Sequence, residues 1–271
     1  MPTAFRFNHD LHIHSLLSAC SRDPEQTPAR LLQYAKEYGL RTLCLTDHYW
    51  DASIPTDSGW YRPQDFDHIA QSLPLPQSDG VRFLFGCETD LTSDLRLGTP
   101  PSRFDDFKFI VIPTTHLHMS ENIRPEDAPF KEARARLWAE RLDALLDLPL
   151  PFEKIGIAHL ACSLLVPSSH GEYLEALDMI PSETMERVFA KAAKTGVGIE
   201  LNSYDLKCPD NEVDTVFRMF RIAKSMGCKF YFGSDAHHPE AFDRVGEIFA
   251  RAIRLLDLHE SDRIAFLDRF S

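Results

Sequence analysis

The amino-acid sequence predicts an α/β protein, most simply a single (β/α) barrel. Short runs rich in β-branched and aromatic residues alternate along the chain with segments whose apolar residues recur at helical spacing. Strands that alternate with helices pair in parallel and are joined by right-handed crossovers. Seven or eight such units close most readily into a barrel, and a doubly wound open sheet is the alternative. We therefore expect one domain over residues 1–271.

The strands and helices are expected at defined places. Seven segments have the composition of buried strands: Asn8–Ile13, Arg41–Thr46, Val81–Cys87, Lys108–Pro113, Lys154–Ala158, Val197–Leu201 and Lys229–Gly233. Five segments have the period of amphipathic helices: Thr27–Tyr38, Arg134–Leu146, Ser182–Lys194, Val213–Met226 and Glu240–Leu256. In the first helix, Thr27 can serve as N-cap and Pro28 fits the first helical position, while Gly39 ends the helix. The stretches Tyr49–Pro63, Leu73–Gly80 and Leu91–Phe104 are rich in Pro, Ser and Gly and are expected to be loops.

Composition and charge narrow the range of partners. The chain has 29 Lys and Arg against 41 Asp and Glu, a formal charge of −12, which argues against a nucleic-acid backbone or an anionic membrane as the main partner. A small anionic substrate stays possible because bound cations can invert the local field. No run reaches the roughly 18 apolar residues of a membrane span, and the N-terminus lacks the pattern of a secretory signal. With six scattered cysteines, expected to be reduced, these features predict a cytoplasmic protein of unspecified oligomeric state.

Polar side chains that can bind a metal or a substrate occur at the end of each predicted strand. In chain order they are Asp10, His12 and His14; Asp47 and His48; Glu88; His116 and His118; His159; Asn202; and Asp235 and His237. In a barrel the carboxyl ends of all strands open onto one mouth, which is where such folds place catalysis. Alternation along a strand sends His12 and His14 to the same face, so both can bind one ion. Nitrogen and carboxylate donors in this number suit Zn²⁺, Mn²⁺ or Fe²⁺ better than Ca²⁺.

Taken together, these motifs resemble the PHP (polymerase and histidinol phosphatase) superfamily. The resemblance rests on DLHIHS, TDH, GCE, a histidine after the fourth strand, AHL, ELN and GSDAH, which follow one another from Asp10 to about Pro239. It implies a distorted (β/α)7 TIM-like barrel with two or three divalent ions at the carboxyl ends of the strands. A stand-alone chain of this length resembles a histidinol phosphatase rather than a polymerase-associated domain.

The resemblance also implies a role for each matching residue. The implied ligands of the first ion are His12, His14, Glu88 and Asp235; those of the second are Glu88, His116 and His159; those of the third are His48 and His237. Asp10 and Asp47 would orient these ligands through hydrogen bonds. Where related proteins often carry a further ligand after the HxH motif, this chain has Cys20, either a thiolate ligand of the third ion or a small buried apolar side chain. In THLHM the usual spacing favours His116 over His118.

The expected reaction is hydrolysis of a small phosphate monoester. Two or three ions would bind the phosphoryl oxygens, and a hydroxide between two of them would attack phosphorus in line. Asp235, His237 or His48 could protonate the leaving alkoxide, and the sequence does not choose among them. The candidates for binding the substrate are Asn202, Lys207, Arg244 and His238.

Two other classes of function stay open from the sequence. One is a metal-dependent amidohydrolase or lactonase, although no lysine at the fourth strand end is placed to form a bridging carbamate. The other is a metal-binding domain without catalysis, which the presence of every core ligand disfavours. Nothing in the sequence specifies histidinol or any other leaving group.

Overall fold

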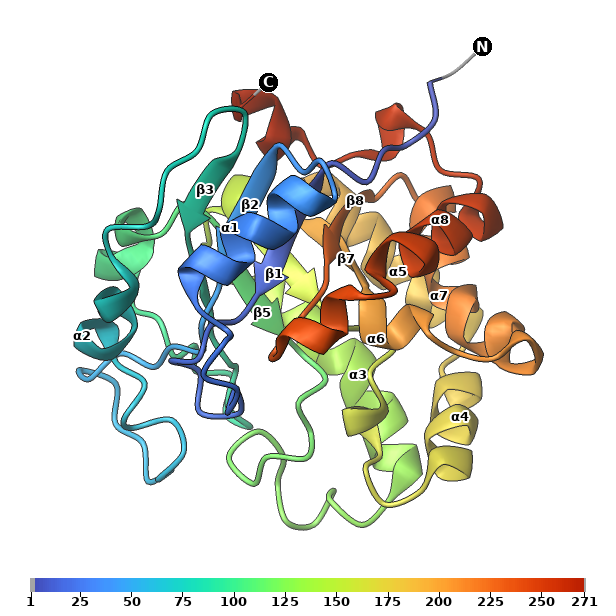
Figure 1. Ribbon diagram of the computed structural model, residues 1–271. Helices are drawn as coiled ribbons and strands as arrows, with labels where there is room; N and C mark the ends of the chain where they lie inside the picture. Colours follow the sequence, from blue (N-terminus) through green and yellow to red (C-terminus); the bar gives the residue numbers. More distant parts are fainter. Residues whose placement is uncertain (1–2, 271) are drawn as a thin grey trace.

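A computed structural model describes residues 3–270 and contains parallel strands flanked by helices (Figure 1). The strands are β1 (His9–Ile13), β2 (Thr42–Leu45), β3 (Arg82–Phe85), β4 (Cys87–Glu88), β5 (Ile110–Pro113), β6 (Ile155–Ala158), β7 (Gly198–Asn202) and β8 (Lys229–Gly233). They form two sheets, with strand orders β1-β2-β3 and β4-β5-β6-β7-β8, and every ladder is parallel. The predicted alternation of strands and helices is confirmed.

The strand count differs from the expected seven because the third predicted strand is divided at Gly86. β3 pairs with β2, whereas β4 pairs with β5. The Gly86 N–H donates to the Leu45 carbonyl at 2.8 Å, and the next residue, Cys87, donates to the Phe109 carbonyl at 3.2 Å. A Cβ atom at position 86 would lie 2.4 Å from the Phe109 carbonyl oxygen. The chain therefore changes sheets at a point where only glycine fits.

The free edges of the two sheets meet where β8 passes beside β1. The Asp235 N–H donates to the His12 carbonyl at 2.7 Å, and the His14 N–H donates to the Ala236 carbonyl at 3.1 Å. These bonds bring the end of β1 against the segment that follows β8. The arrangement is compatible with a TIM-like fold, and it places the two ends of the predicted ligand series side by side.

The helices lie outside the strands (Figure 1). They are α1 (Pro28–Glu37), α2 (Phe66–Ile69), α3 (Lys131–Leu145), α4 (His170–Met179), α5 (Ser182–Thr195), α6 (Ser203–Leu206), α7 (Val213–Ser225) and α8 (Val245–Leu256). The predicted cap of α1 is confirmed, since the Thr27 side chain accepts from the Arg30 N–H. The expected start of the last helix at Glu240 was wrong, because Pro239–Phe242 forms a separate 3₁₀ turn before α8. Within residues 3–270, no helix has the length and apolar character needed to cross a membrane.

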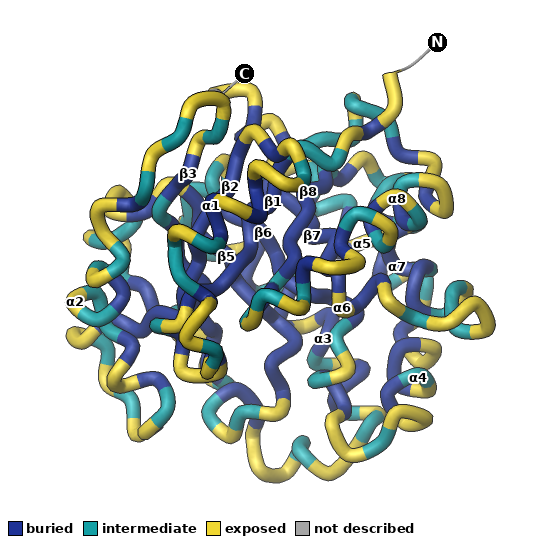
Figure 2. Tube along the Cα trace, viewed as in Figure 1, coloured by how far each residue is buried: buried dark blue, intermediate teal, exposed yellow. Residues whose placement is uncertain are grey.

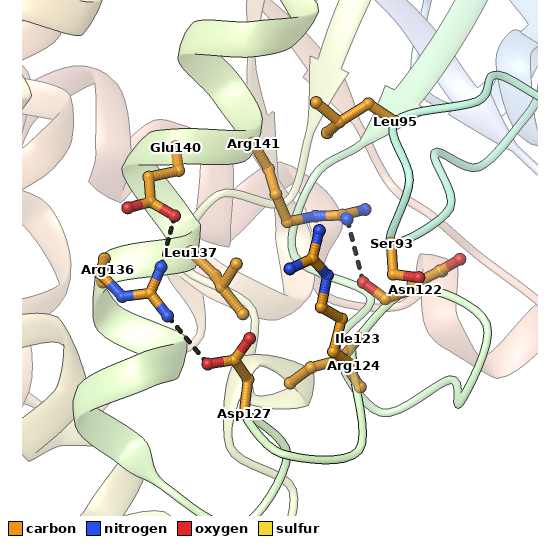
Figure 3. Close-up of a pocket in the computed structure, with 10 residues that line it drawn as sticks. All are labelled: Ser93, Leu95, Asn122, Ile123, Arg124, Asp127, Arg136, Leu137, Glu140 and Arg141. Carbon is orange, nitrogen blue, oxygen red and sulfur yellow. Dashed lines mark hydrogen bonds and ion pairs between the residues drawn. The ribbon is translucent and has the colours of Figure 1, made fainter.

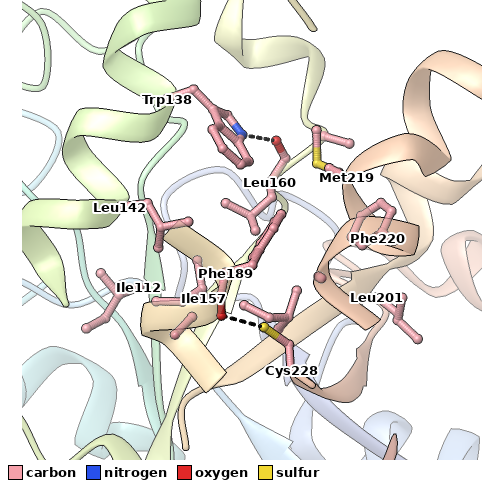
Figure 4. Packing of buried hydrophobic residues seen from close by; sticks show 14 of the residues in the cluster. Ile112, Trp138, Leu142, Ile157, Leu160, Phe189, Leu201, Met219, Phe220 and Cys228 are labelled. Carbon is pink, nitrogen blue, oxygen red and sulfur yellow. Dashed lines mark hydrogen bonds between the residues drawn. The ribbon is translucent and has the colours of Figure 1, made fainter. Parts of the chain in front are cut away.

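Buried residues gather in the strands and on the inner faces of the helices (Figure 2). Between the larger sheet and its helices, Trp138 of α3, Phe189 of α5 and Ile157 of β6 pack in one cluster (Figure 4). The Trp138 indole N–H donates to the Leu160 carbonyl at 2.8 Å. Because Leu160 follows His159 directly, this packing fixes the exit of β6 that carries a predicted ligand.

Candidate metal centre

A pocket of about 180 Å³ lies at the carboxyl ends of the strands. Its lining residues come from strand β4, from the loops that follow β2, β5, β6 and β8, and from the segment after β1: Cys20, His48, Trp60, Tyr61, Glu88, His116, His118, Met119, His159, Leu164, Asp235 and His237. His12 and His14 lie beneath these residues and are fully buried. The structure therefore brings most of the predicted strand-end residues around one pocket.

Four donor atoms converge at the base of the pocket. His12 Nε2 and His14 Nε2 lie 3.1 Å apart. Glu88 Oε2 lies 3.4 Å from His12 Nε2 and 3.3 Å from His14 Nε2. Asp235 Oδ1 lies 3.5 Å and 3.2 Å from the same two nitrogens. Two imidazole nitrogens and two carboxylate oxygens thus surround one small volume.

A second set of donors uses the other oxygen of Glu88. Glu88 Oε1 lies 3.2 Å from His159 Nε2. The His159 ring stacks on the His116 ring, with centroids 4.5 Å apart. Glu88, His116 and His159 each offer a ligand atom within 4.8 Å of the others. His118 is exposed at the pocket wall and belongs to none of the three-donor groups among residues 3–270, whereas His116 does.

A third set contains His14, His48 and His237, whose donor atoms also lie within 4.8 Å of one another. The His14 and His237 rings stack at 4.2 Å. His48 Nδ1 lies 3.0 Å from Glu88 Oε2, but the angles do not suit a hydrogen bond, and this buried nitrogen has no hydrogen-bond partner among the described residues. Cys20 lines the pocket yet is in none of the three-donor groups found in the described part of the chain.

The tautomers of the histidines suit metal binding. His12 Nδ1 lies 2.7 Å from Glu200 Oε1, His116 Nδ1 lies 3.0 Å from Asp90 Oδ1, and His237 Nδ1 lies 2.7 Å from the Asp235 carbonyl oxygen. Each of these partners can only accept, so each Nδ1 carries the proton. Nε2 is then the nitrogen of each ring that can offer its lone pair to a metal ion, once the ion has displaced any proton held there. The donor set therefore fits divalent ions such as Zn²⁺.

Burial and mutual charge perturb the pKa values throughout the cluster. Burial disfavours the charged form of His12, but the carboxylates of Glu200, Asp235 and Glu88 outweigh it and hold the pKa of His12 well above its ordinary value. Burial likewise opposes a charged His159, yet Glu88 raises its pKa to about 9. Burial also opposes ionisation of Glu88 and Asp235. For both residues the neighbouring imidazoles outweigh the effect of burial and lower the carboxyl pKa. The carboxylates of Glu88 and Asp235 are thus ionised, and positive charge in the pocket stabilises them.

The two aspartates predicted to orient ligands act in different ways. Asp47 Oδ1 accepts from the Ser18 hydroxyl at 2.7 Å, and Ser18 Oγ lies 2.9 Å from His14 Nδ1. Asp47 therefore reaches His14 through Ser18. Within residues 3–270, Asp10 forms no hydrogen bond or ion pair with an imidazole; it accepts from the backbone N–H groups of His12 and Ser234 and so holds β1 beside β8.

Sequence reasoning missed two buried carboxylates that hold ligands. Glu200 Oε1 pairs with His12 Nδ1, and its Oε2 accepts from the His159 N–H at 2.7 Å and from the Asn202 side chain at 3.2 Å. Asp90 pairs with His116 and is 1% exposed. The sequence contains an indication of each role: Glu200 is a charged residue inside the apolar strand GIELN, and Asp90 follows Glu88 by two residues.

The predicted substrate-binding residues are not brought together. Asn202 is buried and donates to Asp235 Oδ2 at 3.3 Å, so it supports a ligand of the first set. Lys207, Arg244 and His238 are exposed and do not line the metal pocket. Lys207 and Arg244 line a separate surface hollow beside α8.

Comparison with known proteins concerns the fold. No protein-family model and no curated protein sequence matches the chain. The structure is similar to histidinol phosphate phosphatase from Lactococcus lactis in complex with zinc, L-histidinol and phosphate: identity is 17%, 95% of this chain and 98% of that chain are covered, and the TM-score is 0.59. A dihydropteroate synthase from Coxiella burnetii (12% identity, 94% of each chain, TM-score 0.42) and PsfC from Pseudomonas syringae (16%, 92% of this chain and 97% of that one, 0.41) are less similar and carry no argument. The chain thus shares its overall fold with the Lactococcus phosphatase.

Proposed function

We propose that the protein is a metal-dependent phosphatase that hydrolyses a small phosphate monoester. The observation that carries the proposal is the position of Glu88, whose two oxygens face two different sets of histidines. A carboxylate so placed can hold two ions close together, which is the arrangement of two-metal phosphoryl-transfer sites.

The first ion would be held by His12, His14, Glu88 and Asp235; the second by Glu88, His116 and His159; a third by His48 and His237, near Cys20. Divalent ions in such a site supply Lewis acidity toward the phosphoryl oxygens and a hydroxide nucleophile at neutral pH. The chain itself supplies the geometry, through the hydrogen bonds that fix the free Nε2 atoms.

The pocket suits a small substrate. Its volume of about 180 Å³ is below that of sites for drug-sized ligands. Trp60 and Tyr61 form one wall, and the Trp60 ring meets the His48 ring edge-on at 4.7 Å. Apolar aromatic walls exclude water from the reacting phosphate and contact the alcohol part of the ester.

The leaving alkoxide needs a proton, for which Asp235, His237 and His48 are the candidates. Asp235 is the least suited, because the imidazoles of His12 and His14 keep its carboxylate ionised despite its burial. His48 and His237 both line the pocket and stay as candidates for this proton transfer.

L-Histidinol phosphate is the first natural substrate to assay, because the structurally similar Lactococcus enzyme was solved with L-histidinol and phosphate. Related esters that lack the amino group would show whether this leaving group is preferred.

The test loads the purified chain with Zn²⁺ or Mn²⁺ and assays p-nitrophenyl phosphate, L-histidinol phosphate, and panels of amides and lactones. We expect turnover of phosphate esters that falls at least about a thousandfold in His14→Ala and Glu88→Ala, with two or three ions per chain by elemental analysis. His170→Ala is the matched control, because this exposed imidazole lies outside the metal pocket and should leave turnover unchanged. Turnover of amides or lactones alone, or metal binding without any turnover, would overturn the proposal.

A further inference from the structure

A second pocket, of about 170 Å³, lies between α3 and the loops that follow β4 and β5 (Figure 3). It is separate from the metal pocket in its lining residues. Three arginines line it, Arg124, Arg136 and Arg141, together with two carboxylates, Asp127 and Glu140. In a chain with a net charge of −12, a pocket with more arginines than carboxylates is unexpected.

Arg141 forms the buried side of this pocket. Its side chain is 2% exposed. No carboxylate among the described residues forms a salt bridge with it, although the charge of Asp90 favours its ionised form. Instead, the guanidinium donates to four backbone carbonyls, those of Thr114, Thr92, Asn122 and Leu91. An arginine side chain has five N–H donors, so one on Nη2 has no acceptor among residues 3–270. Although burial lowers the pKa of Arg141 to about 10, the group is still charged at neutral pH.

The opposite side of the pocket also offers donors without acceptors. The exposed guanidinium of Arg124 makes no ion pair or hydrogen bond within the described part of the chain, and neither does the hydroxyl of Ser93. In Figure 3 the side chains of Arg124 and Arg141 both turn into the pocket. The two carboxylates do not compensate them, because Arg136 engages Asp127 at 2.8 Å and Glu140 at 2.6 Å.

Two guanidinium groups that line one pocket make it favourable for an anion to bind between them. Guanidinium groups bind carboxylate and phosphate oxygens with paired, charge-assisted hydrogen bonds. The small volume excludes a nucleotide or a larger ligand. We propose that this pocket is a binding site for a small oxyanion, held by Arg124, Arg141 and Ser93.

The site is linked to the metal centre by a short chain of hydrogen bonds. Arg141 Nη1 donates to the Asn122 carbonyl at 2.9 Å, and the Asn122 side chain donates to Asp90 Oδ1 at 3.1 Å. The same Asp90 oxygen pairs with His116 Nδ1 at 3.0 Å. An anion bound to Arg141 therefore stabilises residues 114–124, the segment that orients His116.

The proposal does not depend on the phosphatase activity, because arginines and not metal ions bind the anion. The test uses the full chain carrying His14→Ala, stripped of metal ions and then freed of the chelator, so that no bound ion competes for phosphate. Inorganic phosphate is titrated into this protein and binding is followed by calorimetry. Arg124 is then labelled with phenylglyoxal, with and without phosphate, and the modified peptide is quantified by mass spectrometry. Acetate in place of phosphate shows whether a carboxylate is accepted equally.

We expect phosphate or acetate to protect Arg124 from labelling, and the added change Arg124→Gln to weaken binding at least about tenfold. Arg254→Gln is the matched control, since Arg254 is also exposed but lies outside this pocket. Hydrogen exchange of residues 114–124 should slow when the anion binds and not in Arg124→Gln. Equal labelling of Arg124 with and without both anions would overturn the site, and unchanged exchange would overturn its link to His116.

Discussion

Replacing Gly233 by alanine tests how tightly Glu200 is packed into the metal centre. A Cβ atom at position 233 would lie 1.8 Å from Glu200 Oε1 and 2.7 Å from His12 Cβ. The backbone of Gly233 is not left-handed, so alanine is tolerated there except for this contact. The Glu200 carboxylate must therefore move.

The loss of stability can be estimated from the hydrogen bonds that Glu200 accepts. Its oxygens accept from His12 Nδ1 at 2.7 Å, from the His159 N–H at 2.7 Å and from the Asn202 side chain at 3.2 Å. Losing one hydrogen bond to a charged group costs about 1.5–3 kcal/mol, and overpacking a buried site adds about 1–3 kcal/mol. We expect Gly233→Ala to lower the free energy of unfolding by about 2.5–6 kcal/mol, or the melting temperature by about 5–24 °C.

Denaturant unfolding of the metal-free protein measures this change, and a zinc titration measures the second consequence. Because Glu200 orients His12 and the backbone of His159, zinc affinity should fall about 10–100-fold. Gly171→Ala is the control, since its added Cβ would meet its nearest neighbour at 3.8 Å, an ordinary contact. If Gly233→Ala unfolds and binds zinc like the unmodified protein, Glu200 does not hold these ligands as described.

Three further predictions concern single carboxylates. Asp90→Asn should weaken one zinc site about tenfold while leaving the others, because Asp90 orients only His116 among the ligands; stepwise zinc titration would show this, and a uniform loss at all sites would contradict it. Glu88→Gln should remove at least one ion per chain in elemental analysis, since Glu88 faces two donor sets; an unchanged metal content would speak against a bridging role. Burial raises the pKa of Asp205 from 3.8 to about 7, so the folded protein favours the protonated carboxyl. Protonated Asp205 therefore stabilises the fold below about pH 4, and this stabilisation is lost as the pH rises from about 4 to 7. Asp205→Asn should therefore give a melting temperature that falls less over this range, and parallel curves for both proteins would refute the assignment.

The strand ends were predictable because their signals are local. Each predicted ligand sits next to an apolar run, and parallel strands must bring such positions to one mouth. Glu88 was placed correctly even though its strand is divided at Gly86, since the switch from β2 to β5 does not change where the segment ends.

Other features of the site and the fold could not be predicted, because they depend on contacts between residues far apart in the sequence. The role of Glu200 arises from residues far away in the chain, His12 and His159, so spacing cannot reveal it. The start of α8 depends on the 3₁₀ turn at Pro239–Phe242, whose composition also suits a helix. Lys207 and Arg244 follow strand ends in sequence, but their side chains turn to the surface.

The partner switch at Gly86 has a consequence for how metal and fold support each other. It places Glu88 on the seam between the two sheets, with His12, His14 and His48 contributed by the smaller sheet and His116, His159 and Asp235 by the larger one. Ions bound in the centre would therefore act as cross-links across this seam. A chelator would then do more than stop turnover: it would remove these cross-links and leave the seam held by protein contacts alone, such as the hydrogen bonds between the end of β1 and the segment after β8.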